Sequence, residues 1–480
     1  MSGFEPAPID NFFQPRGVAI VGASATPGSP NNQMVHFAKR MSLNGKIFPV
    51  NPKVEEIAGL SCFPNLMAIP DPVDLVVLAV GPKNCMAIAH EIKARRQKHG
   101  DAGAVAVVTA GFKEMGTIEG EQLQENLIQT IKSSGARVIG PNCQGVADVY
   151  NGVNTSFTLP PDVEKGGVTI ISQSGAFATS YLRWGKDQKL VGISKFVSLG
   201  NMADLNITDL LEYVETDEKT KAIAVYMEGI QDARKMFDVA ARVARKKPIV
   251  VMKAGRTAMG SCVAQSHTAS IAGNNEIYDG AFLQAGIVRA RSVADFYHTS
   301  RSFAKLPIPQ GNRICIITVI GGPSTICVDE LVSTGEAVLA KFSDQLKAEV
   351  AKHLSASANI GNPDGYIDMT ASVTPIMHTE VLSLLMQEDS IDGIIFMTTP
   401  PGFLKDEELA QAIVAGYNSV PATKRKPLLS VLMAGNAVSK CRTILEENDL
   451  PTFEYPDDAA RVMINMVRYG EFQRRNPQQA

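Results

Sequence analysis

One histidine in a run of small and hydroxyl-bearing residues is the strongest candidate for chemistry in this sequence. Residues 253–273 contain several glycines, serines and threonines around a single imidazole, His267. They follow residues 248–252, an apolar run typical of a buried parallel strand. Small neighbours leave room for another group to approach, and an imidazole on such a loop can act as a nucleophile or as a proton carrier. The spacing alone fits a turn with an incidental surface histidine equally well.

A carboxylate follows another predicted strand. Residues 223–226 form an apolar run, and Glu228 lies at its carboxyl end. The strand that leads to His267 is expected in the same sheet. This carboxylate can then accept a hydrogen bond from the Nδ1 proton of the histidine. The other ring nitrogen then stays unprotonated for attack. Glu228 is alternatively a helix-capping or surface acid.

A third stretch offers a site for an anion. Residues 166–175 predict a strand that runs into a helix starting near Ser174. The free N–H groups and the partial positive charge of a helix start attract anions, and Ser172 and Ser174 add hydroxyl donors. The segment is not the Gly-x-Ser-x-Gly elbow of hydrolases, because its first glycine is missing.

Two strand ends near the start of the chain predict a nucleotide-like ligand. The first is a Gly/Ser-rich turn that can present backbone N–H groups to a phosphate, although it is not Gly-x-Gly-x-x-Gly. This turn comprises Gly22, Ala23, Ser24, Pro27 and Ser29. The second strand end carries Asn51 and Lys53, where a nicotinamide-binding fold usually has an acidic residue for the ribose. Lys53 can instead meet a ribose phosphate, such as that of NADP or coenzyme A, or it merely solvates the strand end.

Two more strand ends point into the same predicted crevice. Residues 79–85, with Val80 and Pro82, form a rigid turn that could hold a flat ring or a pantetheine arm. Residues 138–146 close the domain and are expected to expose Asn142 and Cys143 on a tight loop. Nothing near Cys143 in the sequence would lower the pKa of its thiol, so we expect it to line the crevice and not to act as a nucleophile.

These candidate sites lie on three similar stretches of chain. Each has a glycine or basic start, an apolar strand and a Gly/Ser-rich turn that opens a helix, and they begin at residues 16, 166 and 312. Apolar strands alternate with amphipathic helical segments between them, which predicts parallel, doubly wound sheets with loops at their carboxyl ends. The expected fold class is α/β with three Rossmann- or flavodoxin-like domains, 1–147, 148–305 and 306–465, followed by a tail, 466–480. Further predicted strands are residues 75–80, 104–109, 137–139, 393–397 and 427–432.

Composition narrows the class of protein. The chain has 480 residues and a net charge of −3, so no global field favours nucleic acid or an anionic membrane. We expect no secretory signal, because residues 1–10 lack a basic region followed by an apolar core. We expect no membrane span, because no apolar run approaches about 18 residues. The seven scattered cysteines contain no Cys-x-x-Cys, and no metal-ligand cluster is evident. We therefore expect no metal site in this chain and a reducing, cytoplasmic location.

A set of short motifs runs in order along residues 10–300. The set comprises Gly22-Ala-Ser with Pro27 and Ser29, Val50-Asn-Pro-Lys53, Gly140-Pro-Asn-Cys143 with Gly145, Ser172-Gln-Ser-Gly-Ala176, Ser198-Leu-Gly-Asn201, Glu228-Gly-Ile230, Lys253-x-Gly-Arg-Thr257 and Ser266-His-Thr-x-Ser270. Each motif is weak alone, but the ordered set is highly specific, and it resembles the alpha subunit of the NDP-forming acyl-CoA synthetases. That family includes ADP-forming acetyl-CoA synthetase and, more distantly, succinyl-CoA synthetase.

The resemblance implies a ligase that interconverts carboxylic acid, CoA and NTP with acyl-CoA, NDP and phosphate. It implies that the first domain binds coenzyme A and that the helix start of Ser172, Ser174, Gly175 and Ala176 binds phosphate. His267 would exchange a phosphoryl group with an acyl phosphate while Glu228 orients it, and the loop would then swing to hand the phosphoryl group to a nucleotide. Phosphoryl transfer depends mostly on positioning and charge neutralisation, which such a site supplies.

The same resemblance implies a partner. No Walker A motif and no region of ATP-grasp size after residue 465 is evident. We therefore expect ATP or GTP, with Mg²⁺, to bind an ATP-grasp beta subunit in a heterodimer or heterotetramer. The third domain resembles the family less well, since its loops at residues 318–324 and 362–368 depart from the usual motifs.

Two other functions stay open at this point. One is a CoA-binding regulatory or scaffold protein without turnover, against which the intact residues around His267 and Glu228 argue. The other is an NADP dehydrogenase, which would need a nicotinamide site that the sequence does not show. The carboxylic acid itself is not identified by any charged residue.

Overall fold

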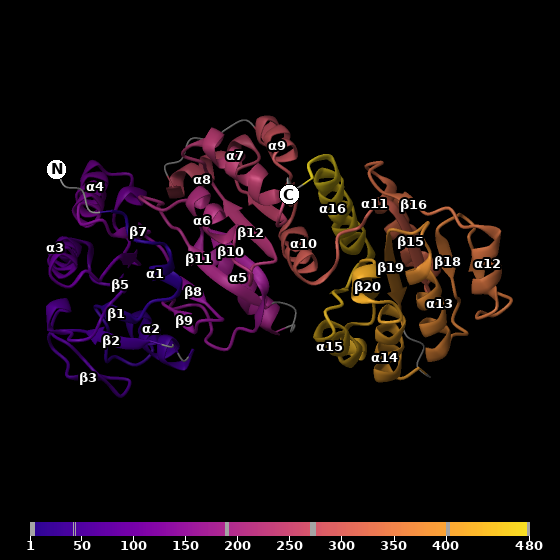
Figure 1. Ribbon diagram of the computed structural model, residues 1–480, viewed down its shortest axis with the longest axis horizontal. Helices are drawn as coiled ribbons and strands as arrows, with labels where there is room; N and C mark the ends of the chain where they lie inside the picture. The colour runs from indigo at the N-terminus through magenta and orange to yellow at the C-terminus, as the bar shows by residue number, and fades with distance from the viewer. Residues whose placement is uncertain are drawn as a thin grey trace. The chain divides into compact units, whose positions relative to one another are not determined.

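The chain folds into α/β units whose strands follow the apolar runs of the sequence (Figure 1). The structure, a computed structural model, describes residues 5–41, 43, 45–187, 192–268, 275–399 and 404–477, without the side chains of residues 187 and 264–268. The chain divides into two compact units, Met1–Arg289 and Ala290–Ala480. The first unit contains two large sheets and the second contains one.

The first sheet is parallel and its strands are short apolar runs. Across the sheet they are β2 (Lys46–Val50), β1 (Gly17–Val21), β5 (Leu75–Leu78), β6 (Ala104–Val107) and β7 (Arg137–Ile139). All residues of β1, β5 and β6 are buried, as expected for strands covered on both faces. The principal helices are α2 (Pro30–Arg40), α3 (Pro82–His99) and α4 (Ile118–Lys132). The strand order reverses between β1 and β5, and the loops at such a reversal are where open α/β sheets bind ligands.

The second sheet is mainly parallel, with an antiparallel edge. Its strands in order are β14 (Ile287–Arg289), β13 (Ile249–Lys253), β12 (Ala222–Met227), β10 (Lys165–Ser172), β11 (Ile193–Ser198), β8 (Val146–Asp148) and β9 (Val153–Asn154). Its helices are α5 (Gly175–Asp187), α6 (Ile207–Val214), α7 (Ala233–Ala244), α8 (Ala258–Thr268) and α9 (Asn275–Gln284). The register pairs Ser172 with both Tyr226 and Ser198, and Met227 with Lys253. The carboxyl ends of β10 to β13 are therefore level, and their loops share one edge.

A buried carboxylate joins these two sheets. Asp204, in the loop after β11, accepts hydrogen bonds from Arg137 Nε and Val138 N, each at 2.9 Å. Lys132 Nζ forms an ion pair with the same carboxylate at 2.8 Å. Burial raises the pKa of Asp204, but the hydrogen bonds from Arg137, Lys132 and Val138 lower it more, so that the pKa lies below its ordinary value. The loop after β11 is thus held against β7 of the first sheet.

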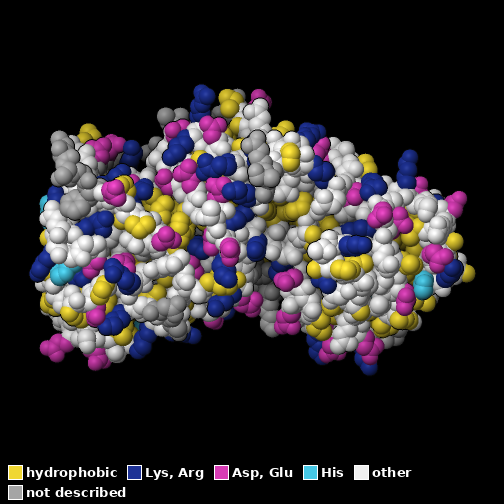
Figure 2. Space-filling view, in the orientation of Figure 1, with side chains coloured by type: hydrophobic (Ala, Val, Ile, Leu, Met, Phe, Trp, Pro, Cys, Tyr) yellow, Lys and Arg dark blue, Asp and Glu magenta, His cyan; other side chains and the backbone are white. Residues whose placement is uncertain are grey.

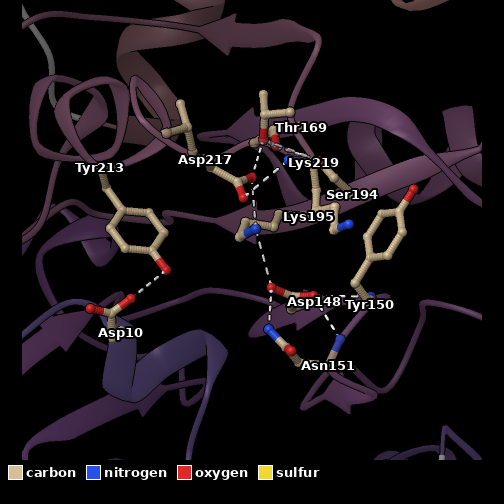
Figure 3. Close-up of polar contacts among 12 residues, drawn as sticks. Asp10, Asp148, Tyr150, Asn151, Thr169, Ser194, Lys195, Tyr213, Asp217 and Lys219 are labelled. Carbon is tan, nitrogen blue, oxygen red and sulfur yellow. Dashed lines mark hydrogen bonds and ion pairs between the residues drawn. The ribbon is translucent and has the colours of Figure 1, made fainter.

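A second set of polar contacts surrounds Lys195 of β11 and extends to α6 and to α1 (Asp10–Phe13), as Figure 3 shows. Lys195 Nζ lies 3.2 Å from Asp148 and 2.8 Å from Asp217, and only 4% of the lysine side chain is exposed. Tyr213 of α6 donates a hydrogen bond to Asp10 of α1 at 2.9 Å. The buried ammonium of Lys195 therefore has two partners of opposite sign, as burial in a protein requires.

The second unit repeats the α/β layering with a single sheet. Its strands in order are β17 (Asn359–Ile360), β18 (Tyr366–Asp368), β15 (Arg313–Thr318), β19 (Gly393–Thr398), β20 (Leu428–Leu432) and β21 (Thr452–Phe453), with β16 (Val338–Leu339) beside β15. Its helices are α10 (Val293–Lys305), α11 (Gly321–Val332), α12 (Asp344–Ala351), α13 (Pro375–Gln387), α14 (Asp406–Tyr417), α15 (Ser439–Glu447) and α16 (Pro456–Arg475). A fully buried ion pair between Arg301 and Glu446, 2.7 Å long, links α10 to α15.

The predicted fold class is confirmed. Three parallel-dominated sheets alternate with helices, and each predicted strand is found, with its ends shifted by at most a few residues. The domain boundaries at 147, 305 and 465 stay predictions. The structure adds that α16 continues to Arg475, with Met466, Val467 and Tyr469 buried.

The surface carries charges of both signs. On the face seen in Figure 2, Lys and Arg side chains are interspersed with Asp and Glu, in keeping with the net charge of −3. Among the described residues, no helix is both long and apolar enough to cross a bilayer. No group of three His, Cys, Asp or Glu residues in the described part of the chain is placed to hold a metal ion.

Candidate active site

The start of α5 forms the centre of the candidate site. The helix begins at Gly175, one residue after the predicted start. Ser172 Oγ donates a hydrogen bond to Ser174 O at 2.6 Å, and Ser174 Oγ accepts the N–H of Phe177 at 3.3 Å. Ala176 in the first turn is exposed. The two hydroxyls therefore shape the turn, and the helix start faces solvent with its positive end.

Gly175 is required by its surroundings. A Cβ at this position would lie 2.5 Å from Gln144 Cγ and 2.8 Å from Ser198 Oγ. Ser198 Oγ in turn accepts the backbone N–H of Gln144 at 2.9 Å. The chain leaving the first sheet and the end of β11 thus press directly on the helix start.

Glu228 lies beside this helix start. The side-chain Oε1 of Gln173 accepts the backbone N–H groups of Glu228 and of Gly229, the latter at 3.1 Å. Glu228 is half-buried. The sheet register and this side chain together bring the backbone of Glu228 close to the start of α5.

Two titratable side chains are perturbed near Glu228. Tyr226 stacks on Phe177 of α5 with ring centroids 4.4 Å apart, and burial together with the Glu228 carboxylate raises the pKa of Tyr226 to about 12. Lys253 is 5% exposed, with its Nζ 5.0 Å from the centre of the Tyr278 ring. Burial and the neighbouring Arg289 lower the pKa of Lys253, while Glu228 partly offsets them. The phenol and the ammonium both experience the field of Glu228.

The backbone of His267 lies in the last turn of α8, and its side chain lies outside the described residues. Ser270 of the same motif is also outside them. The sequence predicts a loop here, whereas residues 258–268 form a helix whose start is capped by Thr257 Oγ1, which accepts the N–H of Gly260 at 3.0 Å. The helix packs near η2 (Lys113–Met115) of the first sheet. The pairing of His267 with Glu228 stays a prediction.

The strand ends of the first sheet are held together by side-chain amides. Asn31 Nδ2 donates to Gly22 O and to Ala79 O, each at 2.7 Å. Asn51 Nδ2 donates to Ala23 O at 2.8 Å. Gly22 has a φ of +90°, and a Cβ there would lie 2.5 Å from Ala79 O. The loops after β1, β2 and β5 therefore lie in direct contact, and Gly22 is where they approach most closely.

The predicted ligand-binding residues on these loops have different roles. Ser29 caps α2, accepting the N–H of Asn32 at 3.3 Å, so its hydroxyl is engaged. Ala23 is fully buried, and its carbonyl oxygen accepts a hydrogen bond from Asn51. Pro27 and Lys53 are exposed. The half-buried members are Gly22, Ser24, Ser29, Asn51, Val80 and Pro82.

The loop after β7 corrects one expectation. Asn142 is exposed as predicted, but Cys143 is only 4% exposed because its thiol points inward, 3.3 Å from Val107 O. Burial raises the pKa of Cys143 to about 12. The expectation of an exposed thiol was wrong, and the raised pKa removes the nucleophilic thiolate.

Asn201, in the loop after β11, joins the second sheet to the first through Glu114 and Gln124. None of these three residues was predicted to make this contact. Asn201 Nδ2 donates to Glu114 Oε2 at 2.6 Å and to Gln124 Oε1 at 2.9 Å. Asn142 Nδ2 lies 3.4 Å from Asn201 Oδ1. Although burial raises the pKa of Glu114, hydrogen bonds from Asn201 and from the N–H groups of Gly111 and Phe112 lower it below its ordinary value. The Asn201 motif is the only sequence signal that could have indicated this contact.

Comparison with known proteins agrees with this architecture. Residues 16–148 match the family described as CoA binding domain, and residues 165–303 match the succinyl-CoA ligase like flavodoxin domain. The chain is 35% identical to acetate–CoA ligase [ADP-forming] II subunit alpha of Pyrococcus furiosus, over 96% of this chain and 97% of that one. It is 34% identical to acetate–CoA ligase [ADP-forming] I of Archaeoglobus fulgidus, of which it spans 64%.

A solved structure extends the agreement to the whole fold. The dinucleotide forming acetyl-coenzyme A synthetase 1 of Ca. Korarchaeum cryptofilum, in complex with phosphate and ADP, superposes with a TM-score of 0.90 at 31% identity. The alignment covers 98% of this chain and all of that one. With the ordered motifs and the shared edge of strand ends, these relationships show that the chain belongs to the NDP-forming acyl-CoA synthetases, as an alpha-subunit-type chain.

Proposed function

We propose that this chain is the subunit of an NDP-forming acyl-CoA synthetase that carries the CoA site and the phosphohistidine. The overall reaction joins a small carboxylic acid to CoA at the expense of NTP and releases NDP and phosphate, reversibly. The observation that carries the proposal is the tie between the start of α5 and the turn of Glu228, made by Gln173 at the carboxyl ends of β10 and β12. This tie between a helix start that suits an anion and the turn that carries Glu228 supports the proposal.

In the direction of acyl-CoA breakdown, the proposed reaction has three steps. A phosphate oxygen attacks the thioester carbonyl, the C–S bond breaks, and the thiolate leaves and takes up a proton. A ring nitrogen of His267 then attacks the phosphorus of the acyl phosphate, and the P–O bond to the carboxylate breaks. The phosphohistidine finally gives its phosphoryl group to NDP, which regenerates the imidazole.

This chain supplies positioning and charge for these steps. The N–H groups of Gly175 and Ala176 at the start of α5 face the phosphoryl oxygens, and Ser172 and Ser174 hold their turn in shape. Glu228 accepts a hydrogen bond from one ring N–H group of the imidazole, so that the other ring nitrogen stays unprotonated for attack. We assign Ala176 to the same phosphate site because it is exposed in the first turn of the helix.

We assign the CoA site to the loops after β1, β2, β5 and β7. The exposed ammonium of Lys53 and the start of α2 suit phosphate groups, so these residues fit CoA. Backbone of the turn at Gly22, Ala23 and Ser24 lies beside them. The remaining assigned residues are Pro27, Ser29, Asn51, Val80, Pro82, Asn142 and Cys143, the last through its backbone because its thiol is buried.

We further propose that ATP or GTP, with Mg²⁺, binds an ATP-grasp beta subunit in a heterodimer or heterotetramer with this chain. Support comes from the Pyrococcus relative, which is named a subunit alpha, and from the longer Archaeoglobus relative, of which this chain spans 64%. A cytoplasmic location agrees with the described cysteines, which are all free thiols.

Phosphohistidine labelling tests the proposal. The chain is mixed with its partner, Mg²⁺ and γ-³²P-labelled ATP, and the product is mapped for acid-labile, base-stable phosphate. We expect label on His267, none in His267→Ala, and acyl-CoA formation only when both chains are present. Tight CoA binding with no label on the complete complex would instead support a regulatory, non-catalytic protein.

A further inference from the structure

The side chain of Gln173 joins the two halves of the proposed phosphoryl-transfer site. Gln173 lies between Ser172 and Ser174, yet it is turned inward, with 6% of its surface exposed. Its Oε1 accepts the N–H groups of Glu228 and Gly229. Its own N–H donates to Tyr226 O at 3.1 Å. Three hydrogen bonds thus tie the turn after β10 to the end of β12.

These hydrogen bonds fix the orientation of the backbone at Glu228 as well as its distance from the turn after β10. One acceptor that serves two successive N–H groups sets the orientation of both peptide planes, and the side chain of Glu228 leaves the backbone between them. On the other side of Gln173, Ser172 Oγ donates to Ser174 O at 2.6 Å and holds the approach to α5. The helix start and the carboxylate therefore share one rigid link.

The burial of Gln173 argues against an incidental role. A buried amide loses its hydrogen bonds to water, and Oε1 recovers two of them from the backbone of the neighbouring turn. The strand register alone would align Ser172 with Tyr226, two residues before Glu228. Beyond that pair the chain leaves the sheet, so the register no longer determines where Glu228 points.

We propose that Gln173 is a positioning residue: its side-chain oxygen holds the backbone of Glu228 in a fixed place relative to the start of α5. The phosphate at the start of α5 and the carboxylate of Glu228 are then held in one fixed arrangement relative to His267. The inference rests on the proposed function, and Gln173 acts through Glu228 without touching the substrate.

The test replaces Gln173 by methionine, which keeps the length of the side chain and removes the acceptor. We expect the single-turnover rate of His267 phosphorylation in the complete complex to fall about 100-fold, the loss typical of a misplacement of about 1 Å at a reacting centre. The dissociation constant of CoA should not change. Gln231→Met is the matched control: Gln231 lies in the same turn and donates one hydrogen bond, to Met202 O at 2.8 Å, and its replacement should leave the rate near that of the parent.

A double-mutant cycle separates positioning from general damage. In a Glu228→Gln background, Gln173→Met should lower the phosphorylation rate little further, because the carboxylate that Gln173 positions is already absent. Gln173→Glu should recover most of the lost rate, since its carboxylate oxygen accepts the same two N–H groups. An equal loss in both backgrounds, or an unchanged rate in Gln173→Met, would overturn the inference. Absence of label on the parent would instead count against the proposed function itself.

Discussion

Replacing Asp204 by asparagine tests the junction that brings the first two sheets together. The side chain of Asp204 is 3% exposed. Its carboxylate accepts hydrogen bonds from the charged groups of Arg137 at 2.9 Å and Lys132 at 2.8 Å, and from the N–H of Val138. Hydrogen bonds to charged groups contribute about 1.5–3 kcal/mol each. Asparagine retains one acceptor oxygen, and water can reach Lys132, which is 48% exposed. We therefore expect a loss of about 2 kcal/mol in the free energy of unfolding, which lowers Tm by roughly 5 °C for a unit of this size.

The pH dependence of that loss has a definite sign. The folded pKa of Asp204 lies below its ordinary value because hydrogen bonds from Arg137, Lys132 and Val138 outweigh the effect of burial, which raises the pKa. A lowered folded pKa gives stability that is complete above the unfolded pKa of about 3.9 and is lost as the pH falls through the folded pKa. The difference in Tm between the parent and Asp204→Asn should therefore be full at pH 7 and shrink below about pH 4.

Calorimetric unfolding across this pH range, with a matched surface control, decides the point. Asp71 pairs with Lys46 at 2.8 Å, but the two side chains are 38% and 66% exposed. Such a pair contributes less than about 1 kcal/mol, so Asp71→Asn should barely change Tm. Equal shifts in the two variants, or a shift for Asp204→Asn that does not change with pH, would refute the reasoning.

Two further predictions concern the CoA loops and the thiols. Lys53→Met should weaken CoA binding roughly tenfold, because one charge-assisted contact is lost. It should leave the affinity for CoA without its 3′-phosphate unchanged. Titration calorimetry with both ligands checks this, and equal weakening for both would contradict the assignment. With a maleimide at pH 8, exposed Cys262 should react first and Cys143 should stay unmodified in the folded chain, because burial raises the pKa of Cys143 to about 12. Peptide mass spectrometry reads the order of modification, and early labelling of Cys143 would contradict its inward orientation.

Local patterns predicted much of this protein. Continuous apolar runs such as residues 104–107 and 249–252 predicted strands covered on both faces, and their alternation with helices predicted parallel sheets. Ser174 and Glu228 were predicted at the ends of strands because the chain turns there from apolar to small or polar residues. The order of the motifs indicated the family, which the relatives then confirmed.

Other features depend on contacts between residues far apart in the sequence. Whether Cys143 faces solvent was decided by the carbonyl of Val107, 36 residues away. The roles of Gln173 and Asp204 follow from partners on neighbouring strands and on a different sheet, and no local pattern distinguishes them from surface amides and acids. The periodicity of apolar residues predicts which face of a helix or strand is buried, because that face is formed by residues close together in the sequence. The direction of a polar side chain at a strand end is set by whichever donor or acceptor the tertiary fold brings within about 3 Å, so only the folded structure could determine it.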